Sequence, residues 1–300
     1  MIRVGLIGYG NYGKKYYDNI INDKKFKIIK ILKKKKISSK LFTNNKKKFF
    51  NIKNIDLYII ASPTHTHFEY LNSIMRKNKH IIVEKPLVKS LEEYLKFKKN
   101  LKKFKKIILI NHTDLNFKSF TNIKKKIKKI GKIKSVTLNY GKKDPYLIKN
   151  INQVSDLPFY EWLPHPLAVI NDLFRNDKFQ ISIKEKKLKR GRFLFQNLQA
   201  NLNTKKIYIK IYFSNNYKYK KRNLVISGSK GSLIFKGYNN KKAFHFKNNK
   251  KINISKKNDD PIANLLDNFN RKFSQKKSQD DRKIICKTTI QLFDILNKIE

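Results

Sequence analysis

Three glycines near the start of the chain constrain its fold more than any other feature. Gly8, Gly10 and Gly13 form a G-x-G-x-x-G pattern that directly follows the apolar segment 2–7 and opens a segment with helical periodicity. In a strand–turn–helix unit, the first glycine allows a tight turn, the second a close approach of a diphosphate, and the third close helix–strand packing. The helix N-terminus itself attracts anions. The pattern therefore predicts a dinucleotide-binding loop made by the six residues Gly8, Tyr9, Gly10, Asn11, Tyr12 and Gly13.

Apolar segments alternate with amphipathic segments over the first 115 residues. The expected strands cover residues 2–7, 26–32, 57–61, 80–83 and 107–110. One expected helix starts near Asn11, and two others cover residues 67–77 and 90–104. The last of these opens with a capping box formed by Ser90 and Glu93. Strands that alternate with helices are typical of a parallel sheet. We therefore predict the α/β class, with a Rossmann-type domain over residues 1–115.

The pattern changes in the rest of the chain. A basic helix over residues 117–130 is expected to end at Gly131, a usual capping position. Alternating segments follow at 133–140, 179–183, 192–202, 206–213, 224–227 and 232–235, and helices are expected at 261–273 and 280–299. Alternation indicates a sheet with one polar face. We predict that residues 116–300 form a second α/β domain with an open, mainly antiparallel sheet.

The net charge of +50 comes almost entirely from lysine, since 63 of the 71 basic residues are lysines. Specific recognition of nucleic acids favours arginine, and Lys, Asn, Ile, Tyr and Phe, all abundant here, are the residues that AT-rich codons encode. Compositional drift therefore explains the charge better than a specific nucleic-acid surface, which remains the alternative. The chain has no apolar run long enough to span a membrane and no signal-peptide pattern, so we expect a cytoplasmic protein. The single Cys286 excludes an internal disulfide.

Polar residues follow two of the later strands, where open parallel sheets place their ligands. Ser62, Pro63 and Thr64 come after strand 57–61, and we expect them, with His67, to contact the dinucleotide. His65 and His67 also raise the possibility of a metal site, which the absence of nearby carboxylates disfavours. Glu84 and Lys85 follow strand 80–83, and we expect both to belong to the cofactor site. A lysine there can lie beside the nicotinamide and stabilise a developing alkoxide.

The end of the second strand lacks the acidic residue that hydrogen-bonds the ribose of NAD in many dinucleotide-binding domains. Lysines 33–36 occupy this place, followed by Ser38 and Ser39. Because cations and hydroxyls favour a 2′-phosphate, Lys33 favours NADP over NAD as the expected cofactor. The alternative explanation is that compositional drift placed lysines at this exposed turn.

Residues 150–174 contain no Lys or Arg, and this stretch includes Glu161 and His165. Histidine is the side chain most easily poised as a general base near neutral pH. Glu161 lies four residues earlier and would share a face with His165 if this segment is helical. A lone histidine is, however, more often structural than catalytic.

Taken in order, these motifs resemble the glucose–fructose oxidoreductase/inositol dehydrogenase family, often written Gfo/Idh/MocA. The resemblance covers essentially the whole chain and is carried by the glycine loop, Ser62-Pro63-Thr64 with His67, Glu84-Lys85-Pro86, Asn111-His112-Thr113, and Glu161 with His165. It implies hydride transfer between the nicotinamide of NAD(P) and a sugar, polyol or sugar-nucleotide hydroxyl or carbonyl.

The resemblance also implies roles for single residues. Lys85 would orient the substrate hydroxyl, His165 would take its proton, and Asn111 would lie where cofactor and substrate meet. Glu161 stands where members usually carry Asp, so its contact with the substrate or with His165 is less defined. Members commonly assemble as dimers or tetramers through the open sheet. A non-catalytic dinucleotide-sensing protein on the same fold is the main alternative, which the presence of both Lys85 and His165 disfavours.

Overall fold

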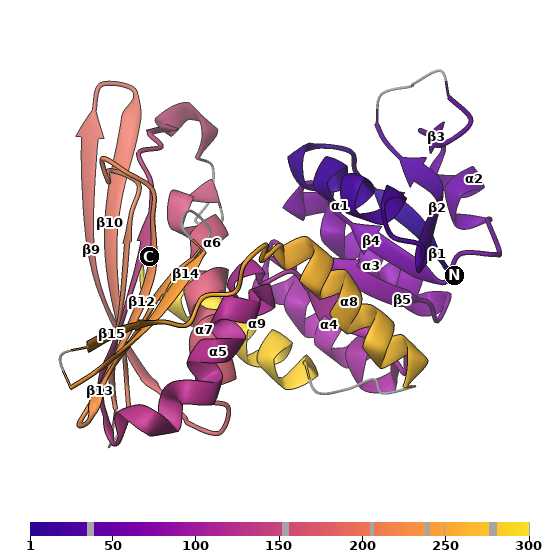
Figure 1. The fold of residues 1–300 in the computed structure, drawn as a ribbon. Helices are drawn as coiled ribbons and strands as arrows, with labels where there is room; N and C mark the ends of the chain where they lie inside the picture. The colour runs from indigo at the N-terminus through magenta and orange to yellow at the C-terminus, as the bar shows by residue number, and fades with distance from the viewer. Residues whose placement is uncertain are drawn as a thin grey trace. The chain divides into compact units, whose positions relative to one another are not determined.

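The computed structural model describes residues 1–34, 39–151, 156–204, 207–237, 241–248, 250–275 and 281–299. It divides into two compact units (Figure 1). The first comprises Met1–Asn111 and Ile262–Cys286, and the second comprises His112–Pro261 and Lys287–Glu300. Lys35, Lys36 and Ser38 of the basic segment after the second strand lie outside the described residues, as do the first residues of the expected elements 206–213 and 280–299.

The first unit contains a six-stranded sheet in the order β3-β2-β1-β4-β5-β6, and all its pairings are parallel. Its strands are β1 (Ile2–Ile7), β2 (Phe26–Leu32), β3 (Phe42–Thr43), β4 (Leu57–Ile60), β5 (His80–Val83) and β6 (Ile108–Ile110). All four residues of β4 are buried, as expected for a strand covered on both faces. The predicted parallel α/β sheet is confirmed, with the two-residue strand β3 as an addition.

Four helices connect these strands: α1 (Asn11–Ile21), α2 (Lys46–Phe50), α3 (His67–Arg76) and α4 (Leu91–Lys103). The predicted cap of α4 is present, because the Ser90 hydroxyl accepts a hydrogen bond from the Glu93 amide at 3.1 Å. The Glu93 carboxylate accepts from the amide of Lys89 at 2.8 Å, one residue before the cap position. Side chains therefore satisfy amides at this helix start, in contrast to α1, whose start at Gly10 has no side-chain cap.

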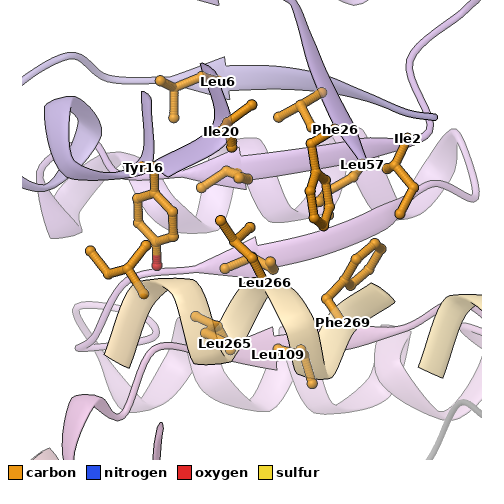
Figure 2. Packing of buried hydrophobic residues seen from close by; sticks show 14 of the residues in the cluster. Ile2, Leu6, Tyr16, Ile20, Phe26, Leu57, Leu109, Leu265, Leu266 and Phe269 are labelled. Carbon is orange, nitrogen blue, oxygen red and sulfur yellow. The ribbon is translucent and has the colours of Figure 1, made fainter. Parts of the chain in front are cut away.

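A late segment of the chain returns to the first unit. Helix α8 (Pro261–Ser274) places Leu265, Leu266 and Phe269 in the same buried cluster as residues of β1, β2, β4 and α1 (Figure 2). Phe269 is fully buried. The linear division at residue 115 assigns this helix to the second domain, whereas residues 262–286 belong to the first unit. The sequence shows that α8 has an apolar face, and only the tertiary structure shows which sheet covers it.

The contacts of His80, the first residue of β5, require a neutral imidazole ring in the folded state. Its Nδ1 accepts a hydrogen bond from the Ile107 amide at 3.1 Å, so this nitrogen carries no proton. Its ring lies edge-to-face against Phe269 and Phe273 of α8, with centroids 5.7 and 5.3 Å away. Burial lowers the pKa of His80 to about 4. An imidazolium here would lose the bond to Ile107, because a protonated Nδ1 cannot accept it, and its charge would be poorly hydrated.

We therefore expect the stability of the first unit to fall in weak acid. The unfolded chain takes up the proton near pH 6.5 and the folded chain only near pH 4, so this contribution is complete above about pH 6.5 and declines as the pH falls toward 4. Thermal unfolding from pH 7 to pH 4 should show a smaller decrease in Tm for His80→Asn, which does not titrate, than for the native chain. Equal decreases in both proteins would contradict the assignment.

The second unit contains a nine-stranded mixed sheet in the order β15-β14-β13-β12-β7-β11-β10-β8, with β9 paired to β10. Its strands are β7 (Ile133–Gly141), β8 (Tyr146–Leu147), β9 (Gln180–Arg190), β10 (Phe193–Asn203), β11 (Tyr208–Ser214), β12 (Lys221–Gly228), β13 (Gly231–Lys236), β14 (Lys242–Lys247) and β15 (Lys250–Asn253). The β7–β11 pair is parallel, and the other described pairings are antiparallel. The predicted mainly antiparallel sheet is confirmed. Strands β14 and β15 were not predicted from their lysine- and asparagine-rich sequence.

Helices of the second unit lie on one face of this sheet (Figure 1). They include α5 (Lys118–Lys126), α6 (Pro158–Trp162), α7 (Pro164–Leu173) and the later part of α9 (Arg282–Leu296). Helix α5 continues as a 3₁₀ turn, Ile127–Ile130, and ends at Gly131, whose φ of 74° favours glycine, as predicted. No helix within the described parts of the chain is both long and apolar enough to cross a membrane.

Candidate active site

The predicted site residues of the first unit meet at one edge of its sheet. Hydrogen bonds extend beyond the strand ends there: the Ala61 amide donates to Ile7, the Glu84 amide to Ile60, and the Asn111 amide to Val83, at 2.8–2.9 Å. These bonds align the residues that follow β1, β4, β5 and β6, which are successive strands of the sheet. Because all four strands are parallel, their carboxyl ends form a single edge. The sheet thus brings together motifs that are spread over more than 100 residues of sequence.

The glycine loop has the backbone geometry that the pattern predicts. Gly8 has a φ of 93°, and a Cβ on it would lie 2.5 Å from the Ala61 carbonyl oxygen. A Cβ on Gly13 would lie 2.3 Å from the carbonyl oxygen of Gly8. Gly10, by contrast, faces open space, with no atom within 4 Å of an added Cβ. Two glycines are therefore required by the fold, while the third keeps space open at an uncapped helix start, as a bound diphosphate requires.

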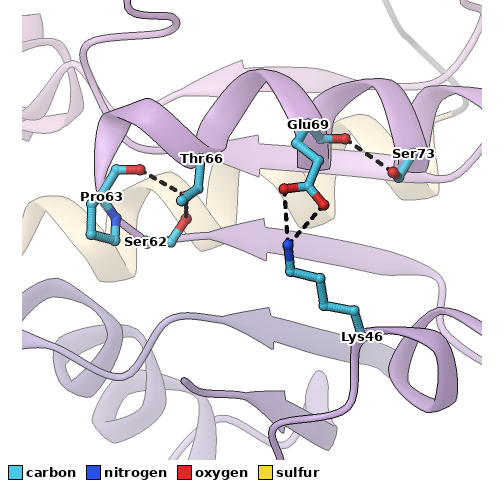
Figure 3. A network of polar contacts seen from close by, with 6 residues as sticks. All are labelled: Lys46, Ser62, Pro63, Thr66, Glu69 and Ser73. Atoms are coloured by element: carbon cyan, nitrogen blue, oxygen red, sulfur yellow. Dashed lines mark hydrogen bonds and ion pairs between the residues drawn. The ribbon is translucent and has the colours of Figure 1, made fainter. Parts of the chain in front are cut away.

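The loop after β4 is held by its own hydrogen bonds (Figure 3). The hydroxyl groups of Ser62 and Thr66 lie 2.7 Å apart, and the Thr66 hydroxyl donates to the Pro63 carbonyl at 2.7 Å. Thr64 begins the short 3₁₀ turn Thr64–Thr66, which leads directly into α3. Farther along, the ion pair between Lys46 and Glu69 joins α2 to α3. Ser62 and Thr64 are partly exposed, so their side chains are available to a ligand at this edge.

His67 is a structural residue of this loop. It is only 1% exposed, and its Nδ1 and Nε2 lie 2.9 and 2.8 Å from the carbonyl oxygens of Pro86 and Ser62. Burial lowers its pKa. The ring therefore connects the loop after β4 with the turn after β5. Among the described residues, no group of three or more His, Cys, Asp or Glu side chains is arranged to hold a metal ion.

The turn after β5 presents a lysine between two buried residues. Glu84 is 6% exposed, Lys85 is partly exposed, Pro86 is buried, and the Lys85–Pro86 peptide bond is cis. The Oε1 atom of Glu84 accepts hydrogen bonds from the Asn111 amide at 2.8 Å and from the Tyr16 hydroxyl at 2.9 Å. Burial raises the pKa of Glu84, while the hydrogen bonds from Asn111 and Tyr16 act in the opposite direction. The Glu84 and Asn111 side chains thus bond to each other.

A positive charge lies beside the glycine loop at the end of β2. The Lys33 ammonium group is 5.9 Å from the centre of the Tyr9 ring, and the Lys33 amide donates to the Thr43 carbonyl at 2.9 Å. The Tyr9 ring also packs edge-to-face against Phe42 of β3. The two described residues directly after β2 are Lys33 and Lys34, so neither of them is the acidic residue that would bond the ribose of NAD.

The second unit places Glu161 and His165 on two short helices. Glu161 is in α6 and His165 is in the first turn of α7, which begins at Pro164, a favourable first helical residue. His165 is 3% exposed, whereas Glu161 is exposed, so the two side chains do not share one environment. Helix α7 is anchored by the Asn171 amide, which donates to Thr288 and Gln291 of α9 at 3.1 and 2.8 Å.

A buried polar cluster next to these helices was not predicted. Asp114 is 1% exposed. Its Oδ2 atom accepts a hydrogen bond from the Tyr140 hydroxyl at 2.7 Å and lies 3.4 Å from Nε of Arg222. The Arg222 guanidinium lies 5.8 Å from the centre of the Trp162 ring, in the helix that carries Glu161. The sequence contained a signal for this cluster, because Arg222 continues the buried alternation of Leu224 and Ile226 along β12.

A parallel sheet with a glycine-rich, uncapped helix start after its first strand defines a dinucleotide-binding Rossmann domain. Residues 2–112 match the model of the GFO_IDH_MocA oxidoreductase family, NAD-binding Rossmann fold. The match covers just over a third of the chain, and it is to the family that the motifs resemble. The conclusion drawn from the sequence, an NAD-binding oxidoreductase fold, is therefore confirmed.

One relative in sequence and two solved structures are similar to this chain. An uncharacterized oxidoreductase of Escherichia coli, YdgJ, is 32% identical over 99 residues, a stretch that covers 31% of this chain and 29% of that protein. The UDP-N-acetylglucosamine 3-dehydrogenase GnnA from Acidithiobacillus ferrooxidans is similar in structure, with a TM-score of 0.80, 13% identity and coverage of 99% and 97% of the two chains. Biliverdin reductase from Synechocystis, solved with biliverdin and NADP+, has a TM-score of 0.77, 15% identity and coverage of 99% and 98%. These two likenesses concern the fold.

Proposed function

We propose that the protein is an NAD(P)-dependent oxidoreductase that transfers a hydride to or from a sugar, polyol or sugar-nucleotide hydroxyl or carbonyl. One observation carries this proposal. At a single sheet edge, an uncapped glycine-rich helix start follows β1 and a partly exposed lysine follows β5, with β4 between the two strands. A dinucleotide-binding protein without a reaction to catalyse has no need of this lysine.

Several residues of the first unit would hold the dinucleotide. The loop from Gly8 to Gly13 offers backbone amides and open space at Gly10 for the diphosphate. Ser62, Pro63 and Thr64 would contribute from the loop after β4, while the buried His67 supports that loop from within. Glu84 and Asn111 would act chiefly by fixing the turn beside Lys85. When bound, the nicotinamide ring supplies the acceptor or donor of the hydride at its C4 position.

The proposed chemistry of the chain's own residues is electrostatic stabilisation and proton transfer. In the oxidation direction, the Lys85 ammonium group orients the substrate hydroxyl and stabilises the negative charge that develops on its oxygen. His165 takes the hydroxyl proton as general base, and returns it to the carbonyl oxygen in the reverse direction. Glu161, which is exposed, would hydrogen-bond the substrate. The roles of Lys85 and His165 follow the family resemblance.

A turnover screen tests this proposal. NADP+ or NAD+ is mixed with the protein and with hydroxyl compounds (sugar nucleotides, inositols and aldoses), NADPH or NADH is mixed with their oxidised, carbonyl forms, and the nicotinamide absorbance is followed. Biliverdin belongs in the panel, since a structurally similar protein binds it. We expect turnover of at least one hydroxyl or carbonyl compound. Turnover of biliverdin alone would contradict the substrate class, and failure to bind either dinucleotide would contradict the proposed function as a whole.

The same screen addresses the choice of cofactor. Because Lys33 places a cation beside Tyr9 and the glycine loop, we propose a preference for NADP, whose 2′-phosphate this charge would attract. The Michaelis constant for NADP(H) should be lower than for NAD(H), and Lys33→Glu should reverse the order. A clear NAD preference in the native protein would contradict this. The homodimeric or homotetrameric state and the cytoplasmic location stay predictions.

A further inference from the structure

The most unusual polar group of the first unit is the carboxyl group of Glu84. It is buried directly before Lys85, where an apolar residue would normally continue the core. A buried carboxyl group is costly unless hydrogen-bond donors compensate for its lost hydration. Two donors do so here, the hydroxyl of Tyr16 and the side-chain amide of Asn111, and both residues are fully buried.

The Tyr16 hydroxyl has no role in packing. Tyr16 lies on the buried face of α1 together with Gly13 and Ile20, and a phenylalanine ring would fill the same space. The hydroxyl instead crosses from α1 to the end of β5 and reaches a residue 68 positions away in the sequence. Since α1 begins at the glycine loop, this bond joins the helix that would hold the diphosphate to the turn that carries Lys85.

The other side of Lys85 is also fixed. The Pro86 carbonyl oxygen lies 2.9 Å from Nδ1 of the buried His67, at the start of α3. Lys85 is therefore bracketed by two buried residues, and each of these contacts a side chain from a different helix. A charged group that stabilises a transition state is effective only when its neighbours hold it in place before the reaction.

We infer that Tyr16 is a positioning residue for Lys85, acting through the carboxylate of Glu84, and that it links the dinucleotide-binding helix to the proposed catalytic lysine. The inference rests on the proposed function, in which Lys85 acts on the substrate. It assigns a role to a residue outside the glycine motif that touches neither substrate nor cofactor in the proposed mechanism. Its loss should affect turnover more than dinucleotide binding.

The test compares two tyrosine hydroxyl groups. Tyr16→Phe removes the bond to Glu84, while Tyr94→Phe removes a matched bond, because Tyr94 is 1% exposed and its hydroxyl donates to the Cys286 carbonyl at 3.1 Å. We expect both variants to fold with similarly lowered Tm. Only Tyr16→Phe should lower kcat, by roughly 10- to 100-fold, since small displacements of catalytic groups have effects of this size. The Michaelis constant for the dinucleotide should stay within about twofold in both.

A second measurement follows Glu84 itself and needs no substrate. The chain has only seven glutamates, so ¹³C-labelled glutamate gives few carboxyl NMR signals, and Glu84→Gln identifies the signal of Glu84 by its loss. Because Tyr16 donates to the charged form, Tyr16→Phe should move the titration midpoint of Glu84 to higher pH. Tyr94→Phe should leave it unchanged.

The outcomes separate this inference from the proposed function. An unchanged Glu84 midpoint in Tyr16→Phe, or equal losses of kcat in Tyr16→Phe and Tyr94→Phe, overturns the inference. Normal turnover by Tyr16→Phe alongside an inactive Lys85→Ala variant overturns the inference alone. Normal turnover by Lys85→Ala overturns the proposed role of that lysine and removes what Tyr16 was inferred to position.

Discussion

Lys85→Ala is expected to lower kcat by roughly 100- to 1,000-fold, the usual cost of removing one group that stabilises a developing oxyanion. Affinity for NADPH should change little, because the glycine loop and the loop after β4 remain intact. Lys89→Ala is a suitable control, since it removes a lysine from the same connection between β5 and α4 without altering the Lys89 amide that bonds to Glu93. Near-normal turnover by Lys85→Ala would contradict the role given to this residue.

His165→Ala should have a comparable effect from the second unit. Loss of a general base typically costs roughly 100- to 10,000-fold in rate, and dinucleotide binding by the first unit should be unaffected. Because His165 is buried in the first turn of α7, His165→Asn is a useful second variant that keeps a polar side chain of similar size. Both variants should be inactive but folded. Activity in His165→Asn would mean that hydrogen bonding suffices and that no proton is transferred at this position.

Within the glycine loop, Gly13→Ala is expected to destabilise the fold strongly, and its comparison with Gly10→Ala separates folding from binding. A Cβ at residue 13 would lie 2.3 Å from the Gly8 carbonyl oxygen, which is backbone and has little freedom to move. We expect the free energy of unfolding to fall by about 2–4 kcal/mol, the range for strong steric conflicts. Chemical unfolding of the whole protein, followed by circular dichroism, measures this loss.

Gly10→Ala should behave in the opposite way. Its Cβ would meet no protein atom within 4 Å, so the free energy of unfolding should stay close to that of the native chain. The same Cβ would occupy the space proposed for the diphosphate. A loss of roughly 1.4 kcal/mol of binding free energy would raise the Kd for NADPH tenfold. Direct titration with NADPH provides the measurement. Native-like affinity in Gly10→Ala would show that the dinucleotide does not approach this helix start.

Local sequence patterns predicted the architecture of the first unit well. The glycine loop, the buried strands and the cap of α4 each depend on residues within a few positions of one another, and their geometry is set by backbone sterics and short-range hydrogen bonds. The placement of Lys85 and Asn111 at one sheet edge also followed from the sequence, because parallel strands have their carboxyl ends on the same side. The strands β14 and β15 were missed because their lysine- and asparagine-rich sequence resembles a loop.

The sequence by itself determined the fold class, the dinucleotide loop and the strand ends at which polar residues gather. The tertiary structure alone decided which distant groups meet: α8 with the first sheet, His67 with Pro86, and Tyr16 with Glu84. The physical reason is that an apolar face or a buried polar group shows in the sequence only as a need for a partner. The partner itself is chosen by packing among segments far apart in the chain. The three glycines therefore predicted where a dinucleotide would bind, and the fold showed how that loop is connected to the lysine proposed to act beside it.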